Sequence, residues 1–330
     1  CSGNQTALTS KHTNVHRAVP PEKRTVRTPI SRPRAIIMQY LRQTAAVCGV
    51  VLSLAVATGC STAGRPQPTR SVVYKTVGDV SLALLLFEPE GHKATDKRPA
   101  IVFFFGGGWN GGTPSQFYPH CAYLASRGMV AVAAEYRIKS KHGTSPYECV
   151  REGKWAIRFI RANARKLGID PNRLAAGGGS AGGHVAATTA TVTAFNQKDE
   201  DTTVSCVPNA LVLFNPVYDN GPEGYGQSRV KERWREFSPM HNIRKGIPPA
   251  IVFLGTNDKL IPVKTGEKFR DKMRAVGSRS ELFLYEDQPH GFFNFGNSNN
   301  KFYVQTVIGS CRNWTSTIAF ACVATRFETA

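Results

Sequence analysis

Apolar residues along the chain occur in short continuous runs that alternate with longer helical patterns. The continuous runs are typical of strands buried on both faces of a sheet, and they predict strands over residues 100–105, 129–136, 173–178, 210–214, 250–254 and 281–286. The longer patterns predict helices over residues 116–127, 146–167, 181–196 and 263–276. Residues 71–77 and 80–89 are expected to form an antiparallel pair of strands before them. This alternation predicts an α/β fold, with a mostly parallel sheet and helices on both faces.

The first 37 residues differ from this pattern. They are polar and basic, contain four prolines and show neither a helical nor a strand period of apolar residues. They therefore cannot bury an apolar core and are expected to be disordered. The segment that follows, residues 38–60, has the form of an export signal, and such signals begin close to a start codon. We therefore expect Met38 to be the natural start and residues 1–37 to be over-called upstream sequence.

Residues 38–60 combine three features of a signal peptide. A short segment with Arg42 is followed by 16 uncharged, apolar residues and then by small residues before Cys60. The apolar stretch is shorter than the about 20 residues that cross a membrane, and it is typical of a secretory signal. The tetrapeptide ATGC that ends at Cys60 resembles a bacterial lipobox, which predicts a lipid-anchored Cys60 in the periplasm or cell envelope. Leu or Val is more usual at its first position, so ordinary secretion and an uncleaved anchor stay open.

The remaining chain is predicted to be a linker over residues 61–70 and a single domain over residues 71–330. With 41% hydrophobic and 20% charged residues, the 330-residue chain has a globular composition, which excludes a collagen-like or coiled-coil protein. The formal net charge is +19, of which residues 1–60 contribute +7 and residues 61–330 contribute +12. The basic residues of the domain are spread along predicted helices without a nucleic-acid-binding motif, so no nucleic-acid partner is expected.

The cysteines do not indicate a metal site. Three of the eight fall within residues 1–60, and the others are Cys121, Cys149, Cys206, Cys311 and Cys322. None forms a CxxC pair or stands at metal-ligand spacing from a histidine. We predict no metal and no organic cofactor. Whether these cysteines are small buried residues or form a disulfide in an exported protein stays open.

The segment GGSAGG around Ser180 carries the strongest chemical signal. It contains the pattern G-x-S-x-G between a predicted strand and a predicted helix, the setting of a nucleophile elbow. The sharp turn exposes the serine hydroxyl at the carboxyl end of the sheet, and the helix behind it favours developing negative charge. A phosphate-binding loop is the alternative, but no Lys-Ser/Thr pair follows the glycines. Ser180 is therefore the candidate nucleophile.

A second glycine-rich segment, FFFGGGW over residues 103–109, follows a predicted buried strand. Glycines let backbone N–H groups approach a ligand oxygen, so Gly107, Gly108 and Ala181 are expected to form an oxyanion hole. Trp109 is a candidate wall of the substrate pocket. Tyr136, between Glu135 and Arg137 at a strand end, is a second candidate for substrate binding, although a structural ion pair in this segment is the alternative.

Asp258 and His290 complete the candidate chemistry. Each directly follows a predicted strand, and alone each could be an ordinary turn or loop residue. The chain order Ser180, Asp258, His290 is that of a Ser–Asp–His triad on a parallel sheet. Two other histidines are weaker candidates: we expect His184 to pack or hydrogen-bond within the helix, and His120 to pack or to line the pocket.

Four segments together resemble the α/β-hydrolase esterases, and most closely the hormone-sensitive-lipase-like carboxylesterases: FFFGGGW, DPNRLAAGGGSAGGH, GTNDKLIPV and QPHGFFNFG. They also resemble bacterial feruloyl and acetylxylan esterases. The resemblance covers roughly residues 70–308 and implies an α/β-hydrolase fold with a small cap-like insertion, which we place at residues 216–248. The chain departs from the family at Phe105, where many members have a supporting His. It departs again over residues 311–330, whose weak periodicity indicates an irregular last helix or an altered reading frame.

These features predict a serine carboxylesterase that hydrolyses short-acyl esters through an acyl-enzyme, with acylated polysaccharide as a further candidate substrate. No long lid insertion precedes Ser180, which argues against an interfacial lipase. Two alternatives stay open. A prolyl-oligopeptidase-type peptidase shares the catalytic domain, but its propeller is missing from this sequence. A non-catalytic envelope binding protein would usually have lost a triad residue. The sequence leaves the oligomeric state open.

Overall fold

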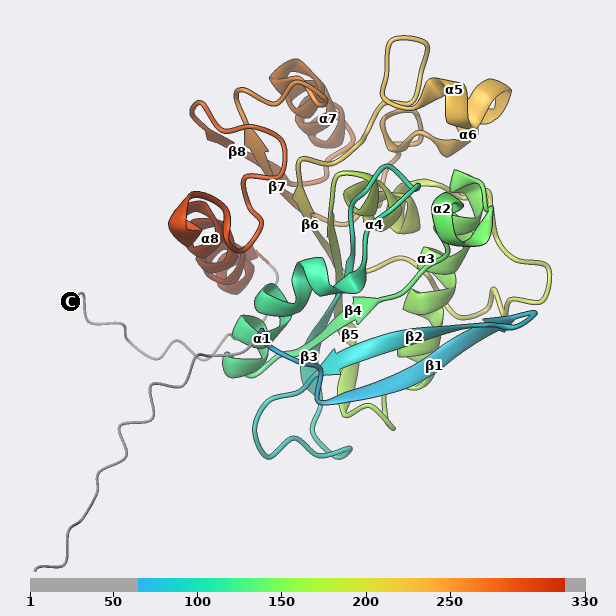
Figure 1. Ribbon diagram of the computed structural model, residues 1–330, viewed down its shortest axis with the longest axis vertical. Coiled ribbons are helices and arrows are strands. Elements are labelled where there is room, and N and C mark those ends of the chain that lie inside the picture. The colour runs from blue at the N-terminus through green and yellow to red at the C-terminus, as the bar shows by residue number, and fades with distance from the viewer. Residues whose placement is uncertain (1–64, 318–330) are drawn as a thin grey trace, which may run out of the picture. The chain divides into compact units, whose positions relative to one another are not determined.

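The computed structural model describes residues 65–317, whose centre is a single eight-stranded sheet (Figure 1). The strands are β1 (Arg70–Val77), β2 (Val80–Phe87), β3 (Arg98–Phe104), β4 (Val130–Ala134), β5 (Ile169–Gly179), β6 (Ala210–Phe214), β7 (Ala250–Gly255) and β8 (Ser280–Tyr285). Their order is β1-β2-β4-β3-β5-β6-β7-β8. β2 pairs antiparallel with both β1 and β4, and every other neighbouring pair is parallel. The predicted α/β fold is confirmed. The predicted export signal, with Cys60, lies outside the described residues.

Helices cover both faces of the sheet. The longer ones are α1 (Tyr118–Ser126), α3 (Pro146–Ala162), α4 (Ala181–Thr191), α7 (Val263–Ala275) and α8 (Lys301–Thr317). Successive side chains of a strand point to opposite faces, so β3 contributes Val102 and Phe104 to the apolar core beneath α3, α4 and α7. From the same strand, Ile101 and Phe103 enter a second core with α1, which lies on the side of α8 (Figure 1). The continuous apolar strand pattern thus reflects burial from two sides.

α4 is shorter than its sequence pattern predicts, because it ends at Thr191 rather than at residue 196. Its last turns contain threonines whose hydroxyls donate to the helix's own carbonyls, at 2.7 Å from Thr188 to Val185 and 2.9 Å from Thr191 to Ala187. Val192 then adopts an extended conformation. β-Branched residues are weak helix formers, and the apolar side chains beyond the helix are buried as a loop instead.

Other boundaries differ from the predictions as well. α3 ends at Ala162 rather than at residue 167. β5 begins at Ile169, four residues before the predicted strand, because Ile169 pairs with Arg98 across an irregularity that accommodates Pro171. At the other end of the domain, α8 continues through Thr317, into the segment whose periodicity is weak. The rest of that tail lies outside the described residues.

The predicted cap-like insertion forms four short helical segments, α5 (Gln227–Val230), η2 (Lys231–Arg233), α6 (Trp234–Phe237) and η3 (Pro239–His241). Tyr218 anchors the insertion, since its carbonyl accepts hydrogen bonds from the Ser238 hydroxyl at 2.9 Å and from the Met240 N–H at 2.9 Å. Between residues 65 and 317, no helix combines the length and apolarity needed to cross a membrane.

Candidate active site

Ser180 occupies a strained turn between β5 and α4. Its backbone has φ 54° and ψ −120°, a conformation that costs a non-glycine residue about 1–3 kcal/mol. The turn is held by its own backbone groups, because the Ser180 N–H donates to the Phe214 carbonyl at 2.9 Å. The Ser180 carbonyl in turn accepts from the N–H groups of His184 at 3.0 Å and Val217 at 3.2 Å. This is the geometry of a nucleophile elbow.

The glycines of the G-x-S-x-G pattern are required by space. A Cβ atom on Gly182 would stand 2.0 Å from the Phe104 carbonyl oxygen, and one on Gly178 would stand 2.6 Å from the same oxygen. Both distances are well inside van der Waals contact. The end of β3 therefore packs directly on the elbow, which brings the glycine-rich loop after β3 against the nucleophile.

Asp258 is held by four hydrogen-bond donors at the end of β7. Its Oδ2 lies 2.7 Å from His290 Nδ1 and accepts from Asn215 Nδ2 at 2.5 Å. Its Oδ1 accepts from the N–H groups of Leu260 at 2.8 Å and Ile261 at 2.9 Å. The carboxylate side chain is completely buried, whereas the His290 side chain is 23% exposed. Asp258 thus fixes one ring nitrogen of His290 and leaves the other free for the cavity.

The ionisation of Asp258 follows from these contacts. Burial alone raises the pKa of its carboxyl, but the hydrogen bonds from His290 and the Ile261 N–H outweigh burial and lower the pKa below its ordinary value. The side chain is therefore a carboxylate at neutral pH and favours the His290 tautomer with a proton on Nδ1. Nε2 is then unprotonated and can act as a base.

Ser180 and His290 line one cavity of about 920 Å³. Gly107 and Gly108 line it as well, at φ 123° and 63°, which are backbone conformations that favour glycine. The loop stands against the nucleophile, since a Cβ on Gly106 would lie 3.3 Å from Ser180 Cβ. Ala181 begins α4 directly behind the serine. The assignment of Gly107, Gly108 and Ala181 as oxyanion donors stays a prediction.

Phe105 takes a structural place in the loop. Its ring stacks on Tyr136 with centroids 4.1 Å apart, and the Tyr136 hydroxyl donates to the Phe105 carbonyl at 2.5 Å. Tyr136 is only 2% exposed and does not line the cavity, so its predicted contact with substrate is wrong. The two stacked rings support the glycine loop from beneath. Trp109 does line the cavity, although it is 1% exposed, and its ring meets His184 edge-on at 5.1 Å.

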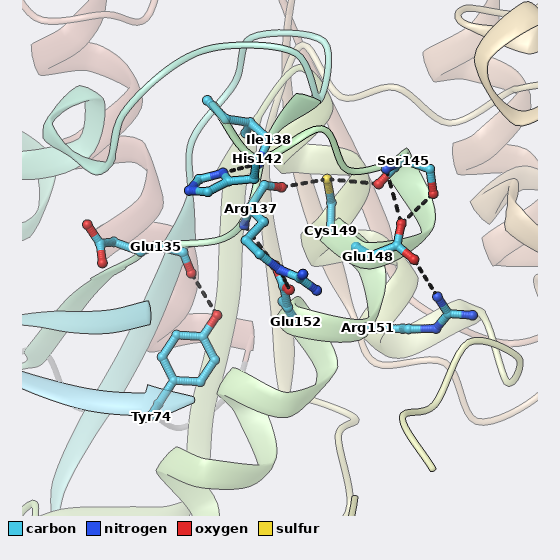
Figure 2. Close-up of polar contacts among 10 residues, drawn as sticks. All are labelled: Tyr74, Glu135, Arg137, Ile138, His142, Ser145, Glu148, Cys149, Arg151 and Glu152. Carbon is cyan, nitrogen blue, oxygen red and sulfur yellow. Dashed lines mark hydrogen bonds and ion pairs between the residues drawn. The ribbon is translucent and has the colours of Figure 1, made fainter. Parts of the chain in front are cut away.

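The segment around Tyr136 is fixed by polar contacts with α3 (Figure 2). Arg137 forms an ion pair with the fully buried Glu152, whose other oxygen accepts from the Arg137 N–H at 2.7 Å. Cys149, which like Cys121 and Cys206 is a buried free thiol, donates to the Arg137 carbonyl at 3.2 Å. The alternative of a structural ion pair is therefore correct for Arg137. These contacts position α2 (Lys139–His142), which borders the cavity.

Gln116 connects the two loops of the site, and the sequence patterns did not indicate it. Its Oε1 accepts from the Gly106 N–H at 2.6 Å, and its Nε2 donates to Asn294 Oδ1 at 2.9 Å. Asn294 belongs to the loop of His290, so this one amide joins the glycine loop to the histidine loop. Asn215, the fourth contact of Asp258, was also missed. Its only sequence signal is its position directly after the buried strand β6.

Replacing Gln116 with alanine is expected to lower kcat for a short-chain ester about 10- to 100-fold, because a loop displaced by about 1 Å loses its alignment with the transition state. KM should change less than about threefold. Gln116→Glu can still accept from Gly106 but cannot donate to Asn294, so its kcat should lie between those of the wild type and Gln116→Ala. Steady-state kinetics of the three proteins tests this. A rise in KM with kcat unchanged would show that Gln116 contacts substrate instead of supporting the loop.

His120 and His184 are both buried, and neither takes part in the contact between Asp258 and His290. His184 Nε2 lies 3.2 Å from the Phe237 carbonyl, in agreement with its predicted packing role. His120 is enclosed by aromatic rings that include Phe117 and Tyr303, and it does not line the cavity. Neither of its ring nitrogens has a hydrogen-bond partner within residues 65–317. Burial lowers the pKa of each of these two histidines to about 3.

Acid should destabilise the protein through these two rings. The unfolded chain binds a proton to each near pH 6.5, whereas the folded chain does so only near pH 3, so the free energy of unfolding falls as the pH drops between these values. Each histidine contributes a slope of about 1.4 kcal/mol per pH unit. His120→Leu is expected to remove one such slope between pH 4 and about 5.5. Urea unfolding at several pH values measures it, and an unchanged slope would contradict the buried neutral state of His120.

Similarity to known proteins extends over most of the described domain. The family model described as BD-FAE matches residues 85–215, which include Ser180, and that of the dienelactone hydrolase family matches residues 225–321, which include Asp258 and His290. The solved apo structure of Thermogutta terrifontis esterase 2 is 43% identical to the chain, with a TM-score of 0.74, over 78% of this chain and 96% of that one. The chain belongs to the α/β-hydrolase esterases. Another structure of that esterase, phosphorylated by paraoxon, is 44% identical with a TM-score of 0.73, over 76% of this chain and 94% of that one.

Curated members of the α/β-hydrolase esterases match the chain over a shorter part of their own length. Esterase LipC of Mycobacterium tuberculosis is 30% identical over 68% of this chain and 59% of its own length. An acetylxylan esterase of Xylanibacter ruminicola is 27% identical over 68% of this chain and 47% of its own length. The chain therefore spans about half of the length of these relatives. Within the described residues, no group of three His, Cys, Asp or Glu side chains is arranged to hold a metal ion.

Proposed function

We propose that this protein hydrolyses carboxylic esters with short acyl chains through a covalent acyl-enzyme. The observation that carries the proposal is the 2.7 Å contact between Asp258 and His290, with His290 lining the same cavity as Ser180 in its strained elbow. A serine hydroxyl is a weak nucleophile unless a neighbouring base takes its proton, and the arrangement supplies such a base.

In the first half of the reaction, Ser180 Oγ attacks the ester carbonyl while His290 Nε2 takes the hydroxyl proton. The tetrahedral oxyanion is stabilised by the N–H groups of Gly107, Gly108 and Ala181. The carbon–oxygen bond to the alcohol then breaks, and His290 gives its proton to the leaving alkoxide. Asp258 stabilises the imidazolium throughout. In the second half, a water molecule attacks the acyl carbonyl while His290 takes a proton from it. The bond between the acyl carbon and Ser180 Oγ then breaks, His290 returns the proton to Ser180 Oγ, and the carboxylic acid leaves.

Two observations support short acyl chains. The cavity is lined mostly by glycine and polar residues, and its apolar and aromatic side chains are few: Trp109, Pro146, Tyr225, Leu260 and Phe293. Solved structures of the Thermogutta esterase are described as butyrate-bound and propionate-bound, with 42% and 43% identity to this chain. Deacetylation of polysaccharide belongs to the same proposal, supported by the similarity to an acetylxylan esterase.

We infer from residues 38–60 that the protein is exported and lipid-anchored at Cys60. Metabolic labelling of the natural host with an alkyne fatty acid tests this. Labelling of the wild type that disappears in Cys60→Ala is the expected result. Unlabelled protein in the culture medium would show ordinary secretion, and residues before Met38 in the mature N-terminal sequence would contradict the assigned start.

The test of the proposed activity uses the purified full-length chain with p-nitrophenyl esters from acetate to palmitate, acetylated xylan and a prolyl amide. The highest kcat/KM is expected at acetate to butyrate. Preference for palmitate would contradict the short-acyl proposal. Turnover of the amide alone would indicate a peptidase, and no turnover of any substrate would favour a binding protein.

A further inference from the structure

The charged side chains that line the catalytic cavity are of one sign. They are Lys139 on α2, Arg229 on α5 and Lys231 on η2, and none of the described lining residues is Asp or Glu. The three cations come from two separate stretches of the chain, the segment after β4 and the cap-like insertion. A cavity with several cations and no acid concentrates anionic ligands.

Arg229 lies directly at the glycine loop. Its Nη1 donates to the Gly108 carbonyl at 2.7 Å, and its guanidinium carbon is 5.4 Å from the centre of the Tyr225 ring. No carboxylate of the described residues lies within 4.0 Å of its nitrogens. The guanidinium has five N–H donors, and this carbonyl contact uses only one of them. Its charge is therefore held beside the predicted oxyanion hole without being neutralised.

The two lysines are positioned by the backbone around this loop. The Lys139 N–H donates to the Trp109 carbonyl at 3.0 Å, so Lys139 is attached to the residue next to Gly108. Lys231 has φ 49° and ψ −133°, a backbone conformation that non-glycine residues rarely adopt. Both side chains are exposed, and neither forms an ion pair within the described part of the chain.

The carboxylates of neighbouring segments are occupied elsewhere. Asp258 lies buried beneath His290 with four donors. Glu148, at the start of α3, accepts from the Ser145 N–H at 3.1 Å and pairs with Arg151 at 2.7 Å (Figure 2). Glu232 follows Lys231 but does not line the cavity. Asp219 and Glu223 line a second cavity, which shares Tyr225 and Leu260 with the first, and there they stand with Lys264 and Lys268.

We propose that the catalytic cavity selects esters that also carry a carboxylate, which Lys139, Arg229 and Lys231 bind while Ser180 attacks the ester. This inference rests on the proposed esterase activity. The carboxylate belongs either to a small acidic ester or to an acidic sugar unit of an acylated polysaccharide. Arg229 offers it a planar pair of N–H groups, and the lysines contribute point charges.

Matched substrates measure this selectivity. The carboxylate 3-acetoxybenzoate is compared with its neutral amide, 3-acetoxybenzamide, and monoethyl succinate with the neutral ethyl succinamate, each rate being divided by the hydroxide-catalysed rate. In at least one pair, kcat/KM is expected to be at least about tenfold higher for the carboxylate at low ionic strength. The ratio should fall towards one in about 1 M salt, where the Debye length is about 3 Å. The rates of deacetylation of acetylated polygalacturonate and acetylated neutral xylan are then compared. A preference for the charged polymer would identify the acidic sugar unit, rather than a small acidic ester, as the source of the carboxylate.

The double variant Lys139→Gln, Lys231→Gln is expected to lower the selectivity ratio about threefold or more, because Arg229 remains. Arg229→Lys keeps the charge but loses the planar pair of N–H groups, so it should retain only part of the ratio. Lys166→Gln removes one exposed charge beyond the far end of α3 and should keep the wild-type ratio. Wild-type ratios near one in both pairs, or an unchanged ratio in the double variant, would overturn the anion site. In either of these two outcomes the wild-type protein still turns over the neutral esters, so the proposed esterase activity stands. Loss of all ester turnover would instead overturn the proposed function, so the two failures are distinguishable.

Discussion

Replacement of Ser180 by alanine is expected to lower kcat for p-nitrophenyl butyrate about 10⁶-fold, the loss typical of removing a serine nucleophile. The fold should be unchanged, because the hydrogen bonds that hold the elbow use the backbone of residue 180 and alanine retains the same Cβ in the same conformation. Single-turnover kinetics measures the residual rate, and the thermal midpoint reports the fold.

The matched control is Ser71→Ala, which changes an exposed serine on the edge strand β1. It should leave both the rate and the thermal midpoint at their wild-type values. If Ser180→Ala keeps more than about 1% of the wild-type rate while folded, an acyl-enzyme on this residue is wrong.

Asp258→Asn is expected to lower kcat about 10⁴-fold with little change in KM. The amide would keep its oxygen towards the Leu260 and Ile261 N–H groups and so present its NH₂ to His290 Nδ1. That contact favours the tautomer with the proton on Nε2, which cannot accept the proton of Ser180. Asn215, whose Oδ1 has no partner within the described residues, can rotate to accept the second amide proton, so the protein should still fold.

Asn215→Ala provides the comparison for Asp258→Asn. It removes one of four donors to the carboxylate but keeps the charge and the contact with His290, so the loss in kcat should be only about tenfold. Kinetics at fixed pH with both variants separates the two effects. Equal losses in both variants would show that Asp258 acts through packing and not through the His290 tautomer.

The elbow and the buried strands were predictable because their signals are local. The glycines near Ser180 and the buried runs of β3 and β7 describe their own environment, whatever the rest of the chain does. Asp258 and His290 could be placed because parallel strands all end at one edge of the sheet. Their mutual contact then required only that two neighbouring loops be short.

The residues that the sequence did not indicate act across long separations. Gln116 reaches Asn294, 178 residues away, and Arg229 reaches Gly108, 121 residues away. No local pattern marks a side chain whose partner is so distant. Tyr136 was misassigned for the same reason, because its place at a strand end agrees equally with a cavity wall and with a support beneath the loop.

Phe105 shows how a departure from the family pattern is accommodated. Many members have a polar His at this position, whereas here an apolar ring stacks on Tyr136, and a Cβ on Gly112 would stand 2.7 Å from that ring. The glycine loop thus folds closely over the Phe105 side chain. Packing takes over the support that a hydrogen-bonding side chain could provide.

The central claim is that Ser180 forms a covalent bond with the acyl group of an ester. Treating the protein with paraoxon, followed by peptide mapping in a mass spectrometer, tests it directly, since an organophosphate traps an activated serine at the step where the acyl-enzyme forms. We predict one diethylphosphoryl group per chain, located on Ser180, with loss of ester turnover in proportion to labelling and no label in Ser180→Ala. A protein that turns over esters but carries the label elsewhere, or remains unlabelled, would contradict the account.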